Sequence, residues 1–308
     1  MCCLFGMIDY GGRLTRKEKV RMLSVLSVAA EERGIDATGI AYNADDSLKI
    51  YKRPLPAHLL WFKVPEDCKV VMGHTRMTTQ GNELFWANNH PFPGKAGKTS
   101  FALAHNGILT NDKRLRRELQ LPATRIETDS YIAAQVLETA SEVSFSTLAD
   151  MAQLLEGTFS LTVMTDRDEL FFIKGNNPLT IFHYEKLGVY LYASTESILK
   201  TAVRQMPVKL GRAAKISIDS GEILKIDAEG KMSRGRFDDS KLFTSNYRSW
   251  GSWFLSEPAW YQTAADETSY LEDLKAVAAM HGLYPADIDA MLADGATVEE
   301  IEELIYSC

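Results

Sequence analysis

The chain opens with MCCLFGMIDYGG (residues 1–12), a cysteine pair followed by an apolar run and a glycine pair. LFGMIDY (4–10) predicts a buried strand that ends at the glycine turn. Cys2 stands directly before this strand, and we expect Met1 to be removed because a small residue follows it. Removal leaves a thiol and a free α-amine on one residue. Two interpretations stay open here: a nucleophile beside its own base, or a small apolar residue that ends a core strand.

The composition is that of a globular protein. The chain has 308 residues, of which 45% are hydrophobic and 24% charged, enough for one large domain with or without a small one. Its four cysteines, at positions 2, 3, 68 and 308, lack the spacing of a metal site and suit a reducing cytosol. Neither a leader nor a membrane-spanning apolar run is recognisable. We expect a cytoplasmic protein that needs no metal or cofactor.

Charge is spread unevenly along the chain. Residues 266–308 hold eleven Asp or Glu and one Lys, a net −10, which leaves +3 of the total −7 to residues 1–265. A nearly neutral body with an acidic tail argues against nucleic-acid binding as the main task. The change of charge also predicts a domain boundary.

The order of the predicted elements favours an α+β fold. A helix over 14–34 begins with a capping box of Thr15 and Glu18. Strands are then predicted at 38–43, 47–52, 69–77 and 101–109, helices at 111–120, 128–140 and 146–157, and strands at 158–165, 169–175, 179–184 and 188–194. Grouped strands and grouped helices fit a layered α+β domain better than a doubly wound parallel sheet.

Strand signals fade near residue 227, which sets the predicted domain limits. The main domain is predicted over 2–230 and a connecting segment that partly packs on it over 231–265. Residues 266–308 form the predicted acidic tail. Its apolar residues recur at helical spacing in three short groups, around 271–277, 288–292 and 298–305.

Five short motifs follow the N-terminal cysteine. They are RGIDATGIAY (33–42), GHTRMTTQG (73–81), NNHPF (88–92), AHNGILTN (104–111) and ETDSYI (127–132). In this order they resemble the class II glutamine amidotransferases, such as the glutaminase domains of glucosamine 6-phosphate synthase and phosphoribosyl-pyrophosphate amidotransferase. The resemblance covers residues 2–227. It implies a four-layer αββα N-terminal-nucleophile hydrolase sandwich. The tail lies outside the resemblance, and its helical spacing predicts a small C-terminal helical module.

Amide hydrolysis needs a nucleophile, a base and donors for the oxyanion. The Cys2 thiol supplies the nucleophile, and its own α-amine, with a reference pKa of about 7.7–8.0, supplies the base. The side-chain amide of Asn106 and the N–H of Gly107 are natural oxyanion donors, since glycine lets a substrate approach the backbone. The alternative for Asn106 is a turn residue before glycine.

The resemblance assigns Arg76 to the α-carboxylate of glutamine and Asp129 to its α-ammonium. A guanidinium suits bidentate carboxylate binding. Thr79 is expected to line the glutamine pocket, and Arg33 and Asp36 are expected to brace the region around the nucleophile. Structural alternatives stay open: a surface ion pair for Arg76, a helix N-cap for Asp129, and a structural ion pair between Arg33 and Asp36.

Three positions depart from the family pattern. Met77 stands where Trp is usual, Gln80 where His is usual, and Tyr131 where Glu is common. None of these changes removes a group that the mechanism needs. The motif histidines, at positions 74, 90 and 105, are interpreted as structural.

No ammonia-consuming domain is recognisable after the main domain. A phosphate loop is absent from the sequence, and too few residues remain for a sugar isomerase or phosphoribosyltransferase domain. We therefore expect a free-standing glutaminase that converts L-glutamine to L-glutamate and ammonia through a Cys2 thioester. A separate synthase, docked through the acidic tail, is the expected acceptor. The alternatives are an amidohydrolase for another amide, a self-contained amidotransferase, and a non-catalytic regulatory protein that retains the fold.

Overall fold

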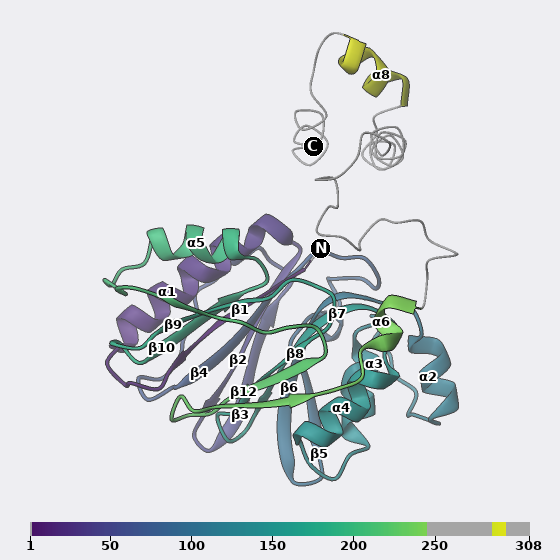
Figure 1. The fold of residues 1–308 in the computed structure, drawn as a ribbon, viewed down its shortest axis with the longest axis horizontal. Coiled ribbons are helices and arrows are strands. Elements are labelled where there is room, and N and C mark those ends of the chain that lie inside the picture. The colour runs from purple at the N-terminus through teal and green to yellow at the C-terminus, as the bar shows by residue number, and fades with distance from the viewer. Residues whose placement is uncertain (1, 245–284, 294–308) are drawn as a thin grey trace. The chain divides into compact units, whose positions relative to one another are not determined.

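The computed structural model describes residues 2–244 and 285–293. The chain divides into two compact units, Met1–Ser245 and Asn246–Cys308. The first unit holds two sheets with their helices (Figure 1). In the second unit, the described residues form helix α8 (Pro285–Ala293).

The first sheet has seven strands in the order β11-β9-β10-β1-β4-β2-β3, and all neighbours in it are antiparallel. Helices α1 and α5 cover its outer face (Figure 1). The bounds are β1 (Cys3–Asp9), α1 (Arg16–Ala29), β2 (Ala37–Ala44), β3 (Ser47–Arg53), β4 (Val70–Arg76), β9 (Thr180–Tyr184), β10 (Val189–Ala193), α5 (Glu196–Arg204) and β11 (Ala214–Ile216), with short 3-10 helices η1 (Ala30–Arg33) and η2 (Ala57–Leu59).

The second sheet has six antiparallel strands in the order β13-β12-β8-β7-β6-β5. Helices α3 and α4 pack on its outer face. The bounds are the 3-10 helix η3 (Trp86–Asn88), β5 (Phe92–Ala96), β6 (Thr99–Leu109), α2 (Asp112–Glu118), α3 (Tyr131–Glu138), α4 (Phe145–Leu154), β7 (Gly157–Thr165), β8 (Leu170–Lys174), β12 (Glu222–Ile226), β13 (Met232–Arg236) and α6 (Ser240–Thr244).

The two sheets pack face to face around a core of their own. Strand β1 shows why its sequence is apolar throughout. Cys3, Phe5 and Met7 belong to the core under the helices, whereas Leu4 and Ile8 belong to the core between the sheets. Alternate residues of a strand point to opposite faces, so a strand buried on both faces needs an unbroken apolar run. The predicted four-layer α+β arrangement is confirmed.

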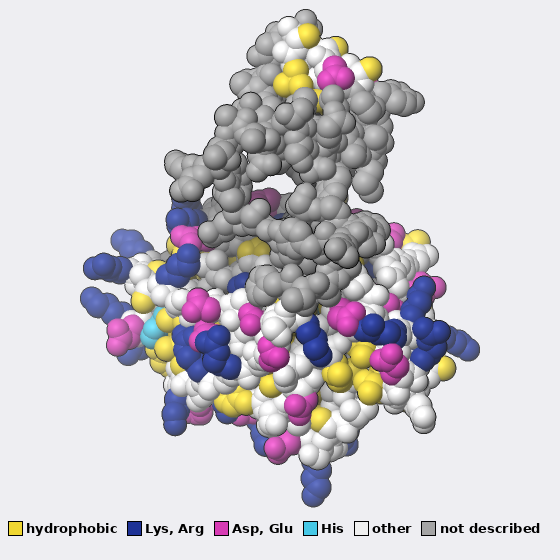
Figure 2. All heavy atoms as spheres, turned by 45° about the vertical axis from the view of Figure 1, so that its right-hand side comes forward, with side chains coloured by type: hydrophobic (Ala, Val, Ile, Leu, Met, Phe, Trp, Pro, Cys, Tyr) yellow, Lys and Arg dark blue, Asp and Glu magenta, His cyan; other side chains and the backbone are white. Residues whose placement is uncertain are grey.

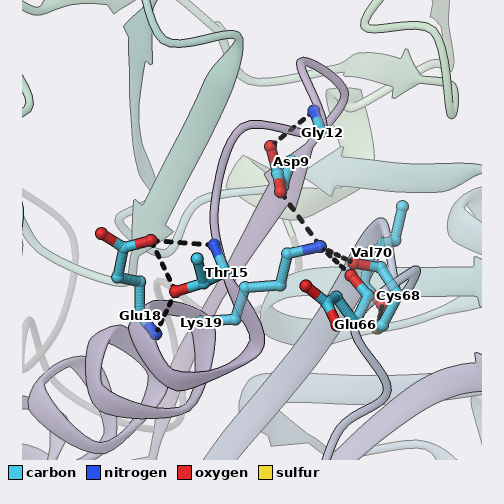
Figure 3. A network of polar contacts seen from close by, with 8 residues as sticks. All are labelled: Asp9, Gly12, Thr15, Glu18, Lys19, Glu66, Cys68 and Val70. Carbon is cyan, nitrogen blue, oxygen red and sulfur yellow. Dashed lines mark hydrogen bonds and ion pairs between the residues drawn. The ribbon is translucent and has the colours of Figure 1, made fainter.

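The start of α1 follows the predicted capping box. The Thr15 hydroxyl accepts from the Glu18 N–H, and the Glu18 carboxylate accepts from the Thr15 N–H at 2.8 Å (Figure 3). The box satisfies two backbone N–H groups that the first helical turn leaves open. It therefore sets the point at which the chain turns from β1 into α1.

A buried cation lies one residue further along α1. Lys19 Nζ forms an ion pair with Asp9 Oδ2 at 3.0 Å and donates to the carbonyls of Glu66 and Cys68, each at 2.7 Å (Figure 3). Both charged side chains are almost fully buried. The ammonium thus ties the end of β1 and the start of α1 to the chain that enters β4.

Strand β13 and helix α6 lie in the first unit, within the segment predicted as a connection. The sequence of β13, MSRGR, alternates exposed and half-buried residues at the edge of its sheet. An edge strand of this kind lacks the apolar run used to predict strands. The predicted domain limits stay predictions, and the helical groups around 271–277 and 298–305 lie outside the described residues.

Charges of both signs are interspersed over the face of the first unit that Figure 2 presents. This mixture matches the nearly neutral charge of residues 1–265. Within the described ranges, no helix combines the length and the apolar character that crossing a bilayer requires.

We predict that Lys19→Met destabilises the protein by about 3–5 kcal/mol, because the Asp9 carboxylate stays buried without its countercharge. Urea denaturation measures the change in the free energy of unfolding. The exposed Lys17 is the matched control, and Lys17→Met should change this free energy by about 0.5 kcal/mol or less. Equal effects of the two substitutions would contradict a stabilising role for the buried pair.

Candidate active site

Three neighbouring strands of the first sheet, β1, β4 and β2, have ends that lie side by side. The register pairs Cys3 of β1 with Thr75 of β4, and Arg76 of β4 with Ala37 of β2. Cys2, which precedes Cys3, and Asp36, which precedes Ala37, therefore lie at the same end of the sheet as Arg76. We call this the site end of the first sheet.

Cys2 stands at the start of the central strand β1 and is partly exposed. Its Sγ donates to the Met77 carbonyl at 3.5 Å. Burial of the thiol raises the pKa of Cys2, while the charge of Arg76 lowers it and the charge of Asp129 raises it. The thiol is therefore protonated near neutral pH and needs a base before it can attack.

Arg33 connects the site end of the first sheet with the second sheet. Its Nε donates to the Cys2 carbonyl at 3.0 Å, and its Nη2 donates to Asn106 Oδ1 on β6 at 3.5 Å. Since η1 ends at Arg33, the end of that helical turn places the guanidinium between the two sheets. One rigid cation thus holds the backbone of Cys2 and the side chain of Asn106 together.

The side-chain amide of Asn106 is fully buried, and only its oxygen has a hydrogen-bond partner among the described residues. Arg33 occupies its Oδ1, whereas its Nδ2 has no hydrogen-bond partner among the described residues. A buried donor without a partner costs about 1–3 kcal/mol in ordinary structural settings. Such a donor is typical of a site whose acceptor arrives with the ligand.

Gly107 follows with a φ of +147°. A Cβ atom at this position would lie 1.9 Å from the Thr158 carbonyl oxygen. No side chain fits that space, so glycine is required for this path of β6. The backbone N–H next to Asn106 is consequently free of any side chain that would shield it.

Arg76 is buried at the end of β4. Its Nη1 donates to Asn89 Oδ1 and its Nη2 donates to the Gln80 carbonyl, both at 2.6 Å. These bonds fix the guanidinium across the loop that follows β4. Arg76 therefore does not form the surface ion pair that its structural alternative required.

Asp36 holds the same loop from the other side. Its Oδ2 accepts from the Thr78 N–H at 2.6 Å, and its own N–H donates to the Arg76 carbonyl at 3.0 Å. Asp36 thus contacts the loop, while Arg33 contacts Cys2 and Asn106. Thr79 lies exposed in this loop.

Asp129 lies just before α3 but does not cap it. No side chain caps the N-terminus of that helix. Asp129 Oδ2 accepts from the Leu109 N–H of β6 at 2.6 Å, and its Oδ1 accepts from the Ser130 hydroxyl at 3.3 Å. The buried carboxylate is thereby anchored to the strand that carries Asn106, within electrostatic reach of Cys2.

The three motif histidines pack behind the site. His74 Nε2 lies 3.0 Å from the His105 carbonyl, and the rings of His74 and His90 are 4.1 Å apart. Burial lowers the pKa of His74 to about 3 and also lowers the pKa values of His90 and His105. These imidazoles are neutral near pH 7. Over residues 2–244 and 285–293, no group of three or more His, Cys, Asp or Glu side chains is placed to hold a metal ion.

Two asparagines in the site received no role from the sequence. Asn89 positions Arg76, and its place inside the NNHPF motif could have drawn attention to it. Asn177 donates from Nδ2 to the Asn106 carbonyl at 2.8 Å. It lies in a short Gly-Asn-Asn run after β8 that belongs to none of the five motifs.

Comparison with known proteins identifies relatives of this chain. Residues 74–201 match the family model described as a glutamine amidotransferase domain. A glutamine–fructose-6-phosphate aminotransferase (isomerizing) of Staphylococcus aureus is 30% identical over 241 residues, which cover 75% of this chain and 38% of that protein. The protein of the same name from Staphylococcus epidermidis is 30% identical over 190 residues, covering 59% of this chain and 30% of that protein.

Solved structures share the fold. The glutamine phosphoribosylpyrophosphate amidotransferase of B. subtilis, complexed with ADP and GMP, gives a TM-score of 0.59 at 22% identity, covering 77% of this chain and 49% of that chain. A structure described as the allosteric regulatory enzyme of purine biosynthesis gives the same TM-score at 21% identity and the same coverage. The chain spans less than half the length of these relatives. The predicted resemblance to class II glutamine amidotransferases is confirmed.

Proposed function

We propose that this chain, which carries a glutamine amidotransferase domain of the class II type, hydrolyses L-glutamine to L-glutamate and ammonia through a thioester on Cys2. The observation that carries the proposal is the open Nδ2 of Asn106. Arg33 holds this buried donor and the backbone of Cys2 with one guanidinium. A nucleophile beside an unpartnered donor is the arrangement that acyl transfer requires.

The reaction begins with proton transfer within one residue. Once Met1 is removed, the α-amine of Cys2 takes the proton of its own thiol. The thiolate attacks the side-chain amide carbon of glutamine, a C–S bond forms, and the carbonyl electron pair moves to oxygen. Asn106 Nδ2 and the Gly107 N–H donate to this oxyanion. The oxyanion electron pair then re-forms the C=O bond and the C–N bond breaks, while the α-ammonium protonates the departing –NH2 group to give ammonia. Water then hydrolyses the thioester to glutamate and restores the Cys2 thiol.

Two opposite charges bind the amino-acid end of the substrate. Arg76 donates one N–H to Asn89 and another to Gln80, and its remaining N–H groups bind the α-carboxylate. Asp129, fixed by Leu109, accepts from the α-ammonium. Thr79 lines the pocket from the loop between them. Free glutamine carries both of these charges, which favours it over other amides.

The ammonia passes to a separate synthase, and the acidic residues of 266–308 dock that partner. Eleven acidic side chains against one lysine give this segment a field of a single sign. An acidic segment of this kind raises the rate of association with proteins that have basic surfaces, and it selects such proteins as partners.

The first prediction concerns Cys2. Cys2→Ser should nearly abolish glutamate release, because serine is a far weaker nucleophile with the same base, whereas Cys3→Ser should retain most of it. Cys3 is the matched control, since it is buried beneath α1. Intact-mass measurement of the active protein should show that Met1 is absent. Full activity in protein that retains Met1 would refute the α-amine as the base.

The second prediction separates catalysis from binding. Asn106→Gly should lower kcat by about 10²–10³, or roughly 3–4 kcal/mol, because it removes a donor used in the transition state. KM for glutamine should change far less, since Arg76 and Asp129 still hold the substrate. Arg76→Ala should instead raise KM most. Kinetics of glutamate release on folded variants provides the measurement, and a near-normal kcat for Asn106→Gly would overturn the assignment of Asn106 as an oxyanion donor.

The third prediction concerns the acidic tail. Removing residues 266–308 should leave glutamine hydrolysis near its normal rate and weaken transfer of ammonia to the acceptor, because the residues placed in the site all lie before residue 178. Glutamate release and pull-down of the synthase measure the two effects separately. A folded truncation that no longer hydrolyses glutamine would show instead that the tail assists the chemistry.

A further inference from the structure

We propose that Asn177 is a positioning residue, which aims the Gly107 N–H at the oxyanion by holding the carbonyl of Asn106. The inference rests on the proposed glutaminase function and adds a residue outside all five motifs. Asn177 Nδ2 donates to the Asn106 carbonyl at 2.8 Å. It therefore acts on the peptide unit whose other end is the Gly107 N–H.

A peptide unit is planar, and in the trans form its C=O and N–H point in opposite directions. The Asn106–Gly107 bond is trans, since the one cis bond of the described chain is His90–Pro91. Holding the carbonyl therefore fixes the direction of the N–H. The φ of Gly107, at +147°, lies outside ordinary strand geometry, although the register with β7 continues through this peptide, with Asn106 opposite Ser160.

Neighbouring hydrogen bonds indicate where this N–H points. The N–H groups of Ile108 and Thr110 donate toward the β7 side, to Thr158 Oγ1 and to the Glu156 carbonyl. The N–H of Leu109 donates to the opposite side, to Asp129 Oδ2. Because backbone N–H groups alternate along a strand, the Gly107 N–H belongs to the side of Asp129, where the substrate binds.

Asn177 is itself held firmly by β7. Its carbonyl accepts from the Ser160 hydroxyl at 2.6 Å, and its N–H donates to the Phe159 carbonyl at 3.3 Å. The side chain of Asn177 is buried, and Ser160 is fully buried. A residue fixed at both backbone ends presents its amide in one place, which gives the Asn106 carbonyl a rigid partner.

Space around the bond is limited as well. An ideal Cβ on Gly107 would meet Asn177 Nδ2 at 2.7 Å as well as the Thr158 carbonyl at 1.9 Å. The glycine that the oxyanion site requires is thus also the residue that lets Asn177 approach. The absence of a side chain at Gly107 and the hydrogen bond from Asn177 therefore fix the same orientation of the Asn106–Gly107 peptide.

The test uses Asn177→Ala and Asn177→Leu in the full chain, because both remove the donor and leucine keeps most of the volume. We expect kcat for glutamate release to fall by about 10- to 100-fold, since a donor that is misplaced loses much of its value in the transition state. KM should stay within about twofold, because Arg76 and Asp129 are untouched. The rate at which iodoacetamide alkylates Cys2 should also stay within about twofold, since this displacement forms no oxyanion.

Asn176→Ala is the matched control. Asn176 lies in the same loop and accepts from the Phe159 N–H at 3.0 Å through Oδ1, so its loss tests the stability of the loop without touching the Asn106 carbonyl. We expect its kcat to stay within about threefold of wild type.

A near-normal kcat in both Asn177 variants would overturn the inference. So would an equal loss in Asn176→Ala, or a loss of alkylation that parallels the loss of kcat. Wild-type protein that releases no glutamate would instead overturn the proposed function itself.

Discussion

The Arg33 guanidinium is the contact on which the proposed site depends, because it joins the backbone of Cys2 in one sheet to the side chain of Asn106 in the other. Cys2 lies at the start of β1 in the first sheet, and Asn106 lies on β6 in the second sheet. Apolar packing sets the distance between sheets but leaves sliding between them poorly specified, since dispersion has no direction. A planar cation with fixed donors supplies that direction. The proposed nucleophile and the proposed oxyanion donor are thereby held by one side chain.

Several of the remaining polar groups hold backbone segments of the site in place. Asp36 and Arg76 shape the loop after β4, and Ser160 holds the residue that binds the Asn106 carbonyl. Site groups are fixed by partners that are themselves buried. Pre-organisation of this kind removes the need to reorient dipoles during the reaction.

The fold could be predicted from the sequence because its signals are local. The apolar run after Cys2 predicted β1, and Thr15 with Glu18 predicted the start of α1. The motif residues were accessible through resemblance to a family. Asn177 was not, because its bond goes to a backbone carbonyl of a distant strand, and such a bond leaves no pattern of residue types. Arg33 was expected to brace the region around Cys2, but its contact with Asn106 was not predicted, since only the packed sheets bring these partners together.

The position of β1 has a consequence for biosynthesis. Strand β1 is made before the other strands of its sheet, yet it pairs with β10, where Phe5 lies opposite Ala193. Pairing across so long a sequence separation closes a large loop and is slow to form. The first sheet cannot be completed until the ribosome has released nearly the whole body of the protein. Under the proposed function, glutamine hydrolysis therefore waits until the strands of the first sheet have left the ribosome and paired.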